Sequence, residues 1–164
     1  MEFVFPDKGT ITVNGAEIGK RERFPEDFRI IIDRSSYIAN KTGFQNLEEL
    51  AMIRGKINDD KIFEEMKNVG FDPRTKQKVK HYSLGMKQKL AIAQAIMEDQ
   101  QVLILDEPFN ALDAERVDRI RNLLFSFKNK GRTILLTSHN QEDINFLCGH
   151  VFRINKYKLE PVER

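Results

Sequence analysis

The sequence predicts an α/β fold whose core is a mainly parallel sheet with a helical subdomain inserted into it. In the last third of the chain, apolar runs at residues 102–105 and 133–137 alternate with stretches of helical periodicity. Strands joined by helices in this way form the crossover units of a parallel sheet. Residues from about 34 to 100 contain only helical and loop patterns, so we expect a core made of residues 1–33 and 101–164, interrupted by a helical subdomain over about 34–100.

Local turn and capping signals place the elements along the chain. Near the N-terminus, Ile11 and Val13 alternate with threonines ahead of Asn14-Gly15, which predicts a hairpin over residues 9–18. An apolar strand over residues 28–32 ends at Asp33. Capping residues and helical spacing predict helices over about 42–55, 58–70, 83–97, 114–130 and 140–147, before a strand pair at 151–154 and 158–159. The apolar runs at 102–105 and 133–137 are typical of strands buried on both faces of a sheet.

Composition and charge exclude several classes of protein. Apolar residues make up 40% of the 164 residues and charged residues 32%, which is a globular composition and not a disordered one. The net charge is only +2, so nucleic acid is not an expected partner. The single cysteine, Cys148, excludes an internal disulfide and a cysteine-based metal cluster. Because no apolar run approaches the roughly 20 residues that span a bilayer, and the start at Met1 has no signal-peptide pattern, we expect a cytoplasmic protein.

Two adjacent carboxylates follow the apolar run at 102–105. Asp106 and Glu107 are thereby predicted at the carboxyl edge of the sheet, where α/β proteins bind ligands. One carboxylate can serve Mg²⁺ through water, while its neighbour polarises an attacking water. A strand that simply ends in two solvated acids is the alternative interpretation.

Three further turns carry candidate residues, each with a plainer alternative. Ser138-His139 ends the next predicted strand, where His139 is either a γ-phosphate contact or an ordinary histidine. Asp113, in the turn 110–113, is either functional or only a helix cap. Ser83 and Gly85 precede a helix, where amide donors and the positive end of the helix dipole suit an anion, although a capped helix without a ligand looks the same.

The order of these motifs resembles that of ATP-binding cassette (ABC) domains of membrane transporters. Residues 82–88 (Y-S-L-G-M-K-Q) resemble the cassette signature in a variant typical of bacterial drug, antibiotic-peptide and sodium exporters. Residues 103–108 resemble the Walker B strand with its catalytic glutamate, 110–113 the D-loop, and 138–139 the switch histidine. Residues 6–15 resemble the hairpin that follows the family's first helix. The resemblance covers essentially the whole chain and implies a P-loop NTPase fold of the ABC type.

The sequence departs from the family pattern at two places. Asp33 falls where the family has its Q-loop glutamine. An acidic residue at this position resembles the cassettes of lantibiotic- and bacitracin-resistance exporters, which often carry glutamate there. The alternative is that Asp33 simply ends the strand. The phosphate loop G-x-x-x-x-G-K-[ST] occurs nowhere in the chain, and residues 15–21 only imitate it. In the family this loop and its helix precede the hairpin at 6–15, so we expect an N-terminally truncated, incomplete cassette that does not hydrolyse ATP alone.

The resemblance implies a role for each candidate residue. Asp106 would hold Mg²⁺ through water, Glu107 would activate the attacking water, and His139 would contact the γ-phosphate of ATP. Asp113 would join the dimer seam and Asp33 would relay to the membrane partner. Ser83 and Gly85 would contact the nucleotide of a second nucleotide-binding domain.

Three classes of function remain open. The chain is expected to be the ATP-binding fragment of an exporter, held at the membrane surface by a permease subunit. It is also expected to self-associate, because its sheet lacks a covering helix. A non-hydrolysing partner that lends its signature to a full-length cassette is the first alternative. A cassette protein acting on ribosomes or in DNA repair is the second, and the Y-S-L-G-M-K-Q variant disfavours it.

Overall fold

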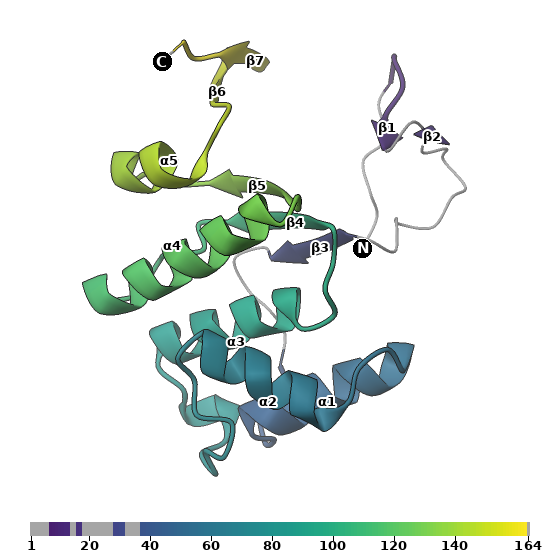
Figure 1. The fold of residues 1–164 in the computed structure, drawn as a ribbon, viewed down its shortest axis with the longest axis vertical. Coiled ribbons are helices and arrows are strands. Elements are labelled where there is room, and N and C mark those ends of the chain that lie inside the picture. Colours follow the sequence, from purple (N-terminus) through teal and green to yellow (C-terminus); the bar gives the residue numbers. More distant parts are fainter. Residues whose placement is uncertain (1–6, 14–15, 18–27, 32–36, 164) are drawn as a thin grey trace.

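A three-stranded parallel sheet organises the computed structural model of this chain, which describes residues 7–13, 16–17, 28–31 and 37–163 (Figure 1). Its strands are, in order across the sheet, β3 (Phe28–Ile31), β4 (Val102–Asp106) and β5 (Thr133–Thr137). Both pairings are parallel, with Leu105 of β4 between Ile31 and Leu136. Helices connect these strands along the chain, so the predicted crossover units are confirmed.

The helices begin at the residues whose side chains cap them. Each cap accepts a hydrogen bond from a free amide in the first turn of the helix, which is a short-range interaction readable from sequence. The capped helices are α1 (Gly43–Arg54, cap Thr42), α2 (Asp59–Asn68, cap Asn58), α3 (Leu84–Ile96, cap Ser83), α4 (Ala114–Asn129, cap Asp113) and α5 (Gln141–Leu147, cap Asn140). A short 3-10 helix, η1 (Val79–His81), precedes α3. All five predicted helices are confirmed.

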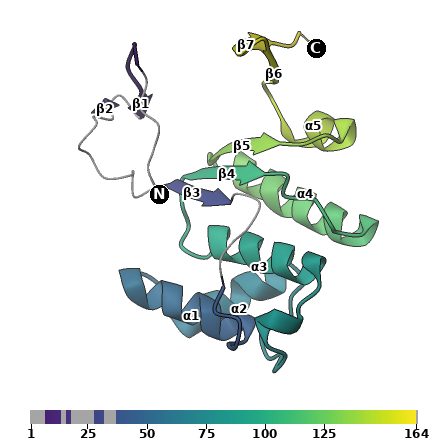
Figure 2. The same cartoon turned by 180° about the vertical axis from the view of Figure 1, so that it is seen from behind.

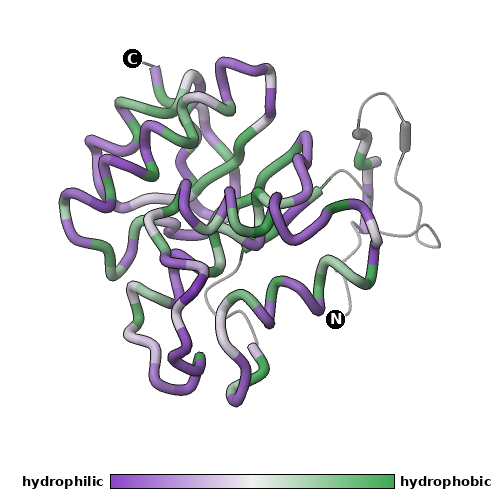
Figure 3. Tube along the Cα trace, turned by 60° about the horizontal axis from the view of Figure 1, so that its bottom comes forward, coloured by the Kyte–Doolittle hydropathy of each residue, from purple (hydrophilic) through white to green (hydrophobic). Residues whose placement is uncertain are grey.

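One face of the sheet forms the core together with α1, α2, α3 and α4. Figures 1 and 2 both show α1, α2 and α3 as a helical layer on one side of the sheet, and α3 contacts β3 while α4 contacts β5. The fully buried side chains come from both layers and include Leu47, Met66, Leu90 and Leu103. In Figure 3 the hydrophobic stretches run through the middle of this body, and the hydrophilic ones follow its outer turns.

The prediction that the strands are buried on both faces is wrong. Leu103 and Leu105 are at most 1% exposed, whereas Leu135 in the middle of β5 is 61% exposed. Exposure alternates along both β4 and β5, because the described helices that cover the sheet, α3 and α4, pack against the same face. The apolar sequence of β5 is therefore only half used by the core of this chain.

Two antiparallel hairpins complete the described structure. Strands β1 (Thr12–Val13) and β2 (Ala16–Glu17) pair as predicted, while the turn residues Asn14-Gly15 lie outside the described residues. Strands β6 (Phe152–Asn155) and β7 (Lys158–Pro161) pair across a turn whose two residues both have positive φ. In Figures 1 and 2 this second hairpin stands apart from the three-stranded sheet. Among the described helices, none is both long and apolar enough to cross a membrane.

Candidate functional site

Asp106 and Glu107 lie at the carboxyl edge of the sheet, beside the end of β5. Asp106 is the register partner of Thr137, whose Oγ1 donates a hydrogen bond of 2.6 Å to Asp106 Oδ1. The same hydroxyl oxygen accepts a 3.0 Å hydrogen bond from the backbone N–H of Glu107. Thr137 therefore fixes both the first carboxylate and the backbone of the second. Sequence reasoning placed Thr137 in the strand but missed this role.

Glu107 and His139 are brought together at this edge. Glu107 has a φ of 46°, a left-handed conformation that is uncommon for a residue other than glycine. This turn aims the carboxylate, which is 22% exposed, at the imidazole, and Nε2 of His139 lies 3.1 Å from Oε1 of Glu107. The imidazole itself is 97% exposed. The two groups lie within hydrogen-bond distance of each other at the surface, an arrangement suited to binding or orienting a polar ligand.

A cavity of about 560 Å³ opens beside this pair. It is lined by residues of both strand ends and of the turns that follow, among them Glu107, Asn110, Ser138 and His139. The cavity therefore joins the turn that leads into α4 with the turn that leads into α5. Residues from three of the sequence motifs, 103–108, 110–113 and 138–139, therefore line the same cavity.

The turn that carries His139 is held by a buried ion pair. Ser138 Oγ donates a 2.8 Å hydrogen bond to Asp143 and accepts one of 3.1 Å from the backbone N–H of Asn140. Asp143 is 2% exposed and accepts from Arg121 Nε at 2.6 Å. Burial of Arg121 acts to lower its pKa, but the hydrogen bonds and charges of Asp143 and Glu142 outweigh burial and raise the pKa. Both hydrogen bonds of Ser138 thus stabilise the turn. Sequence reasoning missed the roles of Asp143 and Arg121.

The Ser83 turn packs against the turn at 110–113. Ser83 caps α3 by accepting from the backbone N–H of Met86 at 3.2 Å. A Cβ added at Gly85 would lie 2.6 Å from the carbonyl oxygen of Ala111, closer than real contacts allow. A glycine is therefore required at this position for packing, whatever else it does. This contact links two of the predicted motifs within one chain.

Gln88, one turn further along α3, also contacts the segment that follows β4. Its Nε2 donates to the carbonyl oxygen of Pro108 at 3.0 Å and approaches that of Glu107 at 3.4 Å. These hydrogen bonds hold the start of α3 against the backbone at Glu107, the candidate catalytic residue. Sequence reasoning placed Gln88 in the 82–88 motif but did not predict this contact.

Asp113 and Asp33 are the remaining residues that were predicted from the sequence. Asp113 caps α4, accepting from the backbone N–H of Arg116 at 3.1 Å, and forms an ion pair with the Arg116 side chain. The prediction that Asp113 caps a helix is confirmed. Asp33 lies outside the described residues.

The donor set at the end of β4 fits a hard cation. Asp106 and Thr137 supply carboxylate and hydroxyl oxygens side by side, and Mg²⁺ prefers oxygen ligands. Within the described part of the chain, no group of three or more His, Cys, Asp or Glu side chains is placed to hold a metal ion. A cation here would depend on ligands that this site does not itself provide, such as water and phosphate.

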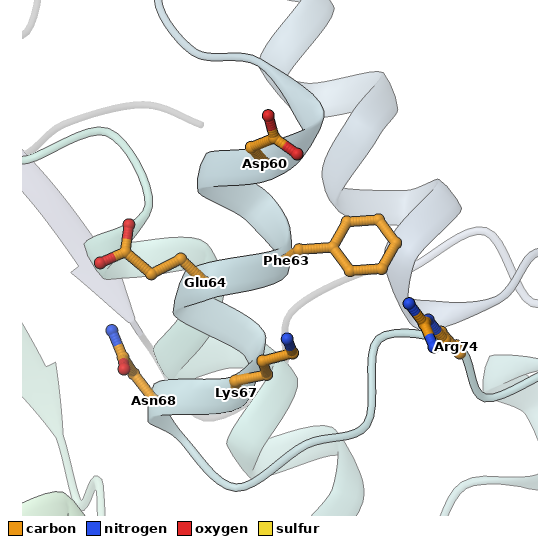
Figure 4. Close-up of a pocket in the computed structure, with 6 residues that line it drawn as sticks. All are labelled: Asp60, Phe63, Glu64, Lys67, Asn68 and Arg74. Carbon is orange, nitrogen blue, oxygen red and sulfur yellow. The ribbon is translucent and has the colours of Figure 1, made fainter.

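A second pocket, of about 540 Å³, lies away from all these residues. Figure 4 shows its lining along α2 and the loop after it: Asp60, Phe63, Glu64, Lys67, Asn68 and Arg74. Two acidic and two basic side chains are among these residues, so the charges of the lining balance. None of the residues predicted from sequence lines this pocket, so we do not place the site there.

Comparison with known proteins identifies the family of this chain. A family model described as "ABC transporter" matches residues 1–110. An uncharacterized ABC transporter ATP-binding protein of Bacillus subtilis, YybJ, is 37% identical over 99% of this chain and 74% of its own length. The bacitracin transport ATP-binding protein BcrA of Enterococcus faecalis is 34% identical over 88% of this chain. The lantibiotic transport ATP-binding protein SrtF of Streptococcus pyogenes is 30% identical over 96% of it.

A solved structure has the same fold. The dimeric structure of MJ0796, a bacterial ABC transporter cassette, superposes with a TM-score of 0.64 at 22% sequence identity, over 71% of this chain and 54% of that one. The chain therefore belongs to the ATP-binding proteins of the ABC transporter family and has the P-loop NTPase fold of an ABC cassette. It spans 47% of the length of BcrA and 67% of that of SrtF.

Proposed function

We propose that this chain is the ATP-binding subunit of an ABC-type exporter of a drug, an antibiotic peptide or a similar substrate. The observation that carries the proposal is the 3.1 Å contact between Glu107 and His139, at the sheet edge where Asp106 also lies. Relatives named for bacitracin and lantibiotic transport support the substrate class. In this role the chain is cytoplasmic and attached to the inner face of the membrane through a permease subunit.

The residues of this edge divide the chemistry among them. ATP with Mg²⁺ supplies the phosphoryl group to be transferred and the charge that neutralises its oxygens. Asp106 would hold the cation through water, Glu107 would orient the attacking water, and His139 would contact the γ-phosphate. Ser83 and Gly85 face the nucleotide of a second nucleotide-binding domain, and Asp113 lies at the seam between the two. Asp33 connects the site to the permease. In this proposal the core comprises residues 1–33 and 101–164, and the helical subdomain about 34–100.

The residues present fit only the γ-phosphate end of ATP. The pattern G-x-x-x-x-G-K-[ST] is absent from these 164 residues, and its amides and lysine are what cradle the β- and γ-phosphates. We therefore expect the chain alone to bind Mg-ATP weakly or not at all, and to show no ATPase activity. Micromolar binding, about −8 kcal/mol, in a calorimetric titration would contradict this expectation.

Adding the missing loop tests the proposed roles. A graft of about 40 residues, carrying a strand, a phosphate loop and a helix from a related cassette, is expected to give ATP turnover. In that protein Glu107→Gln should abolish turnover while Mg-ATP still binds. Turnover that survives Glu107→Gln would remove Glu107 from catalysis, and a graft that binds but never turns over would refute the proposed site.

A non-hydrolysing role is the second candidate, favoured by the exposure of the Ser83 turn. Leu84, beside Ser83, is 70% exposed, so the start of α3 is accessible to another cassette. A full-length relative whose own signature serine is disabled offers the test. Stimulation of its ATPase by this chain, lost in Ser83→Ala, supports the role of signature donor. No stimulation by the wild-type chain rules that role out.

We also propose that the chain associates with a second copy through the open face and outer edge of β5. The strand has no charge and no proline, the devices that usually protect an edge strand from pairing. Leu135 is its middle residue, so antiparallel pairing about a two-fold axis sets Leu135 opposite Leu135 of the second copy. Such an interface is self-complementary and differs from an ATP-dependent sandwich.

Light scattering across a range of protein concentrations tests this association. We expect dimers for the wild type and monomers for Leu135→Lys, which places a charge at the centre of the edge. Ile53→Lys is the control, because Ile53 on α1 is 78% exposed but distant from β5. A monomeric wild type, or equal association of Leu135→Lys, would contradict the proposal.

A further inference from the structure

A buried carboxylate sits at the junction between α3 and β4. The side chain of Glu98 is fully buried, and its Oε2 lies 2.5 Å from Arg29 Nη2 and 2.8 Å from Arg54 Nη1. The same oxygen accepts a hydrogen bond of 3.1 Å from Gln100 Nε2. A buried charge is stable only when it is paired and hydrogen-bonded. Glu98 therefore ties β3 and the end of α1 to this junction.

The next residue makes a second set of ion pairs. Asp99 has a φ of 56°, so the chain reverses in a left-handed conformation at this point. Its carboxylate lies 2.6 Å from Arg132 Nη2, just before β5, and 3.9 Å from Lys61 Nζ on α2. Two consecutive acids thus bind cations from β3, α1, α2 and the segment before β5. The sheet and the helical layer of α1, α2 and α3 therefore meet at this junction.

The junction controls the distance between the two halves of the candidate site. From it α3 runs to the Ser83 turn, and β4 runs to Asp106 and Glu107. Helix α3 has 13 residues, which makes it about 20 Å long, so a rotation of about 10° at the junction displaces its far end by about 3 Å. Gln88 lies about 12 Å along the helix from its C-terminal end, so the same rotation displaces Gln88 by about 2 Å. That displacement exceeds the tolerance of a hydrogen bond, so the 3.0 Å contact of Gln88 with Pro108 would be lost.

We propose that Glu98 and Asp99 are positioning residues that set the angle between the helical layer and the sheet. By fixing that angle they hold the Ser83 turn beside the carboxylates at the end of β4. Neither acid touches the candidate site, and they act only through the directions of α3 and β4. An effect of this angle on ATP binding or hydrolysis rests on the proposed function. The angle between the helical layer and the sheet exists without nucleotide and can be measured in its absence.

The test is a distance between spin labels at the far end of α3 and in α5. Lys87→Cys and Asn145→Cys, both at exposed positions, carry the labels in a Cys148→Ser background. Glu98→Gln keeps the shape of Glu98 but removes its charge, and should shift the mean distance by about 2 Å or broaden its distribution. Asp99→Asn should act in the same direction and is the milder change, since the Asp99 side chain is 60% exposed.

Controls separate positioning from general destabilisation. Glu49→Gln removes one charge from an exposed ion pair with Lys41 that does not involve the junction, and should leave the distance unchanged. Glu98→Asp retains the charge and should recover part of the wild-type distribution. Folded Glu98→Gln and Asp99→Asn proteins with the wild-type distance would overturn the proposal, as would an equal shift in Glu49→Gln. If Glu98→Gln does not fold, Asp99→Asn alone decides.

Discussion

Replacing Gly85 with alanine is expected to destabilise the protein, although alanine is the better helix former. Gly85 is the second residue of α3, and its added Cβ would lie 2.6 Å from the carbonyl oxygen of Ala111. The opposing atom belongs to the backbone, so it cannot rotate away as the end of a side chain can. To reach an ordinary separation of about 3.5 Å, the two segments must part by about 1 Å.

The magnitude follows from two opposing contributions. Glycine to alanine gains at most about 1 kcal/mol of helix propensity, and less at a helix start. Overpacking against a fixed neighbour costs about 1–3 kcal/mol. The neighbour here is held in place, because Ala111 lies in a turn closed by the hydrogen bond from Leu112 N to Phe109 O. We therefore expect a net loss of about 1–2 kcal/mol, or about 3–6 °C in Tm for a domain of this size.

Urea unfolding followed by circular dichroism measures this loss. The midpoint should fall with an unchanged m-value, since the surface exposed on unfolding stays the same. Gly149→Ala is the matched control, because no heavy atom lies within 4 Å of its Cβ position, and its effect should stay within about 0.5 kcal/mol. If Gly85→Ala were as stable as the wild type or as Gly149→Ala, the contact with Ala111 would not constrain this turn.

Three further predictions concern residues near the site. Ala111→Gly should raise the unfolding free energy by about 0.5 kcal/mol in urea titration, because Ala111 has a φ of 62° that glycine adopts without strain. Thr137→Val should cost about 1–2 kcal/mol by the same assay, since Asp106 loses a 2.6 Å hydrogen bond donated to a charged group. Burial raises the pKa of Tyr82, opposed in part by the N–H of Gly43, so the fold favours the neutral phenol. Its contribution to stability is complete below the unfolded pKa of about 10 and is lost as pH rises above it; Tyr82→Phe should remove this alkaline loss, and a variant with the wild-type pH dependence would contradict the assignment.

The sequence determined the local elements because their causes are local. Thr42, Asn58, Ser83, Asp113 and Asn140 each cap a helix by a hydrogen bond to an amide two or three residues ahead. Such bonds depend on neighbours in the chain and not on what packs against the helix. Alternating helices and apolar runs likewise predicted the parallel sheet, whose carboxyl edge then collected Asp106, Glu107 and His139.

Only the tertiary structure decided which long-range partners those residues have. Thr137 bonds Asp106 across 31 residues, and Gln88 bonds Pro108 across 20, and no local pattern predicts either contact. The sequence also failed to show that one face of β5 is open, because an apolar run states that a strand can be buried and not which elements cover it. No local pattern assigned a role to Glu98, which follows the helix predicted over 83–97. Its burial among cations from β3 and α1 exists only once the sheet and the helical layer have been assembled.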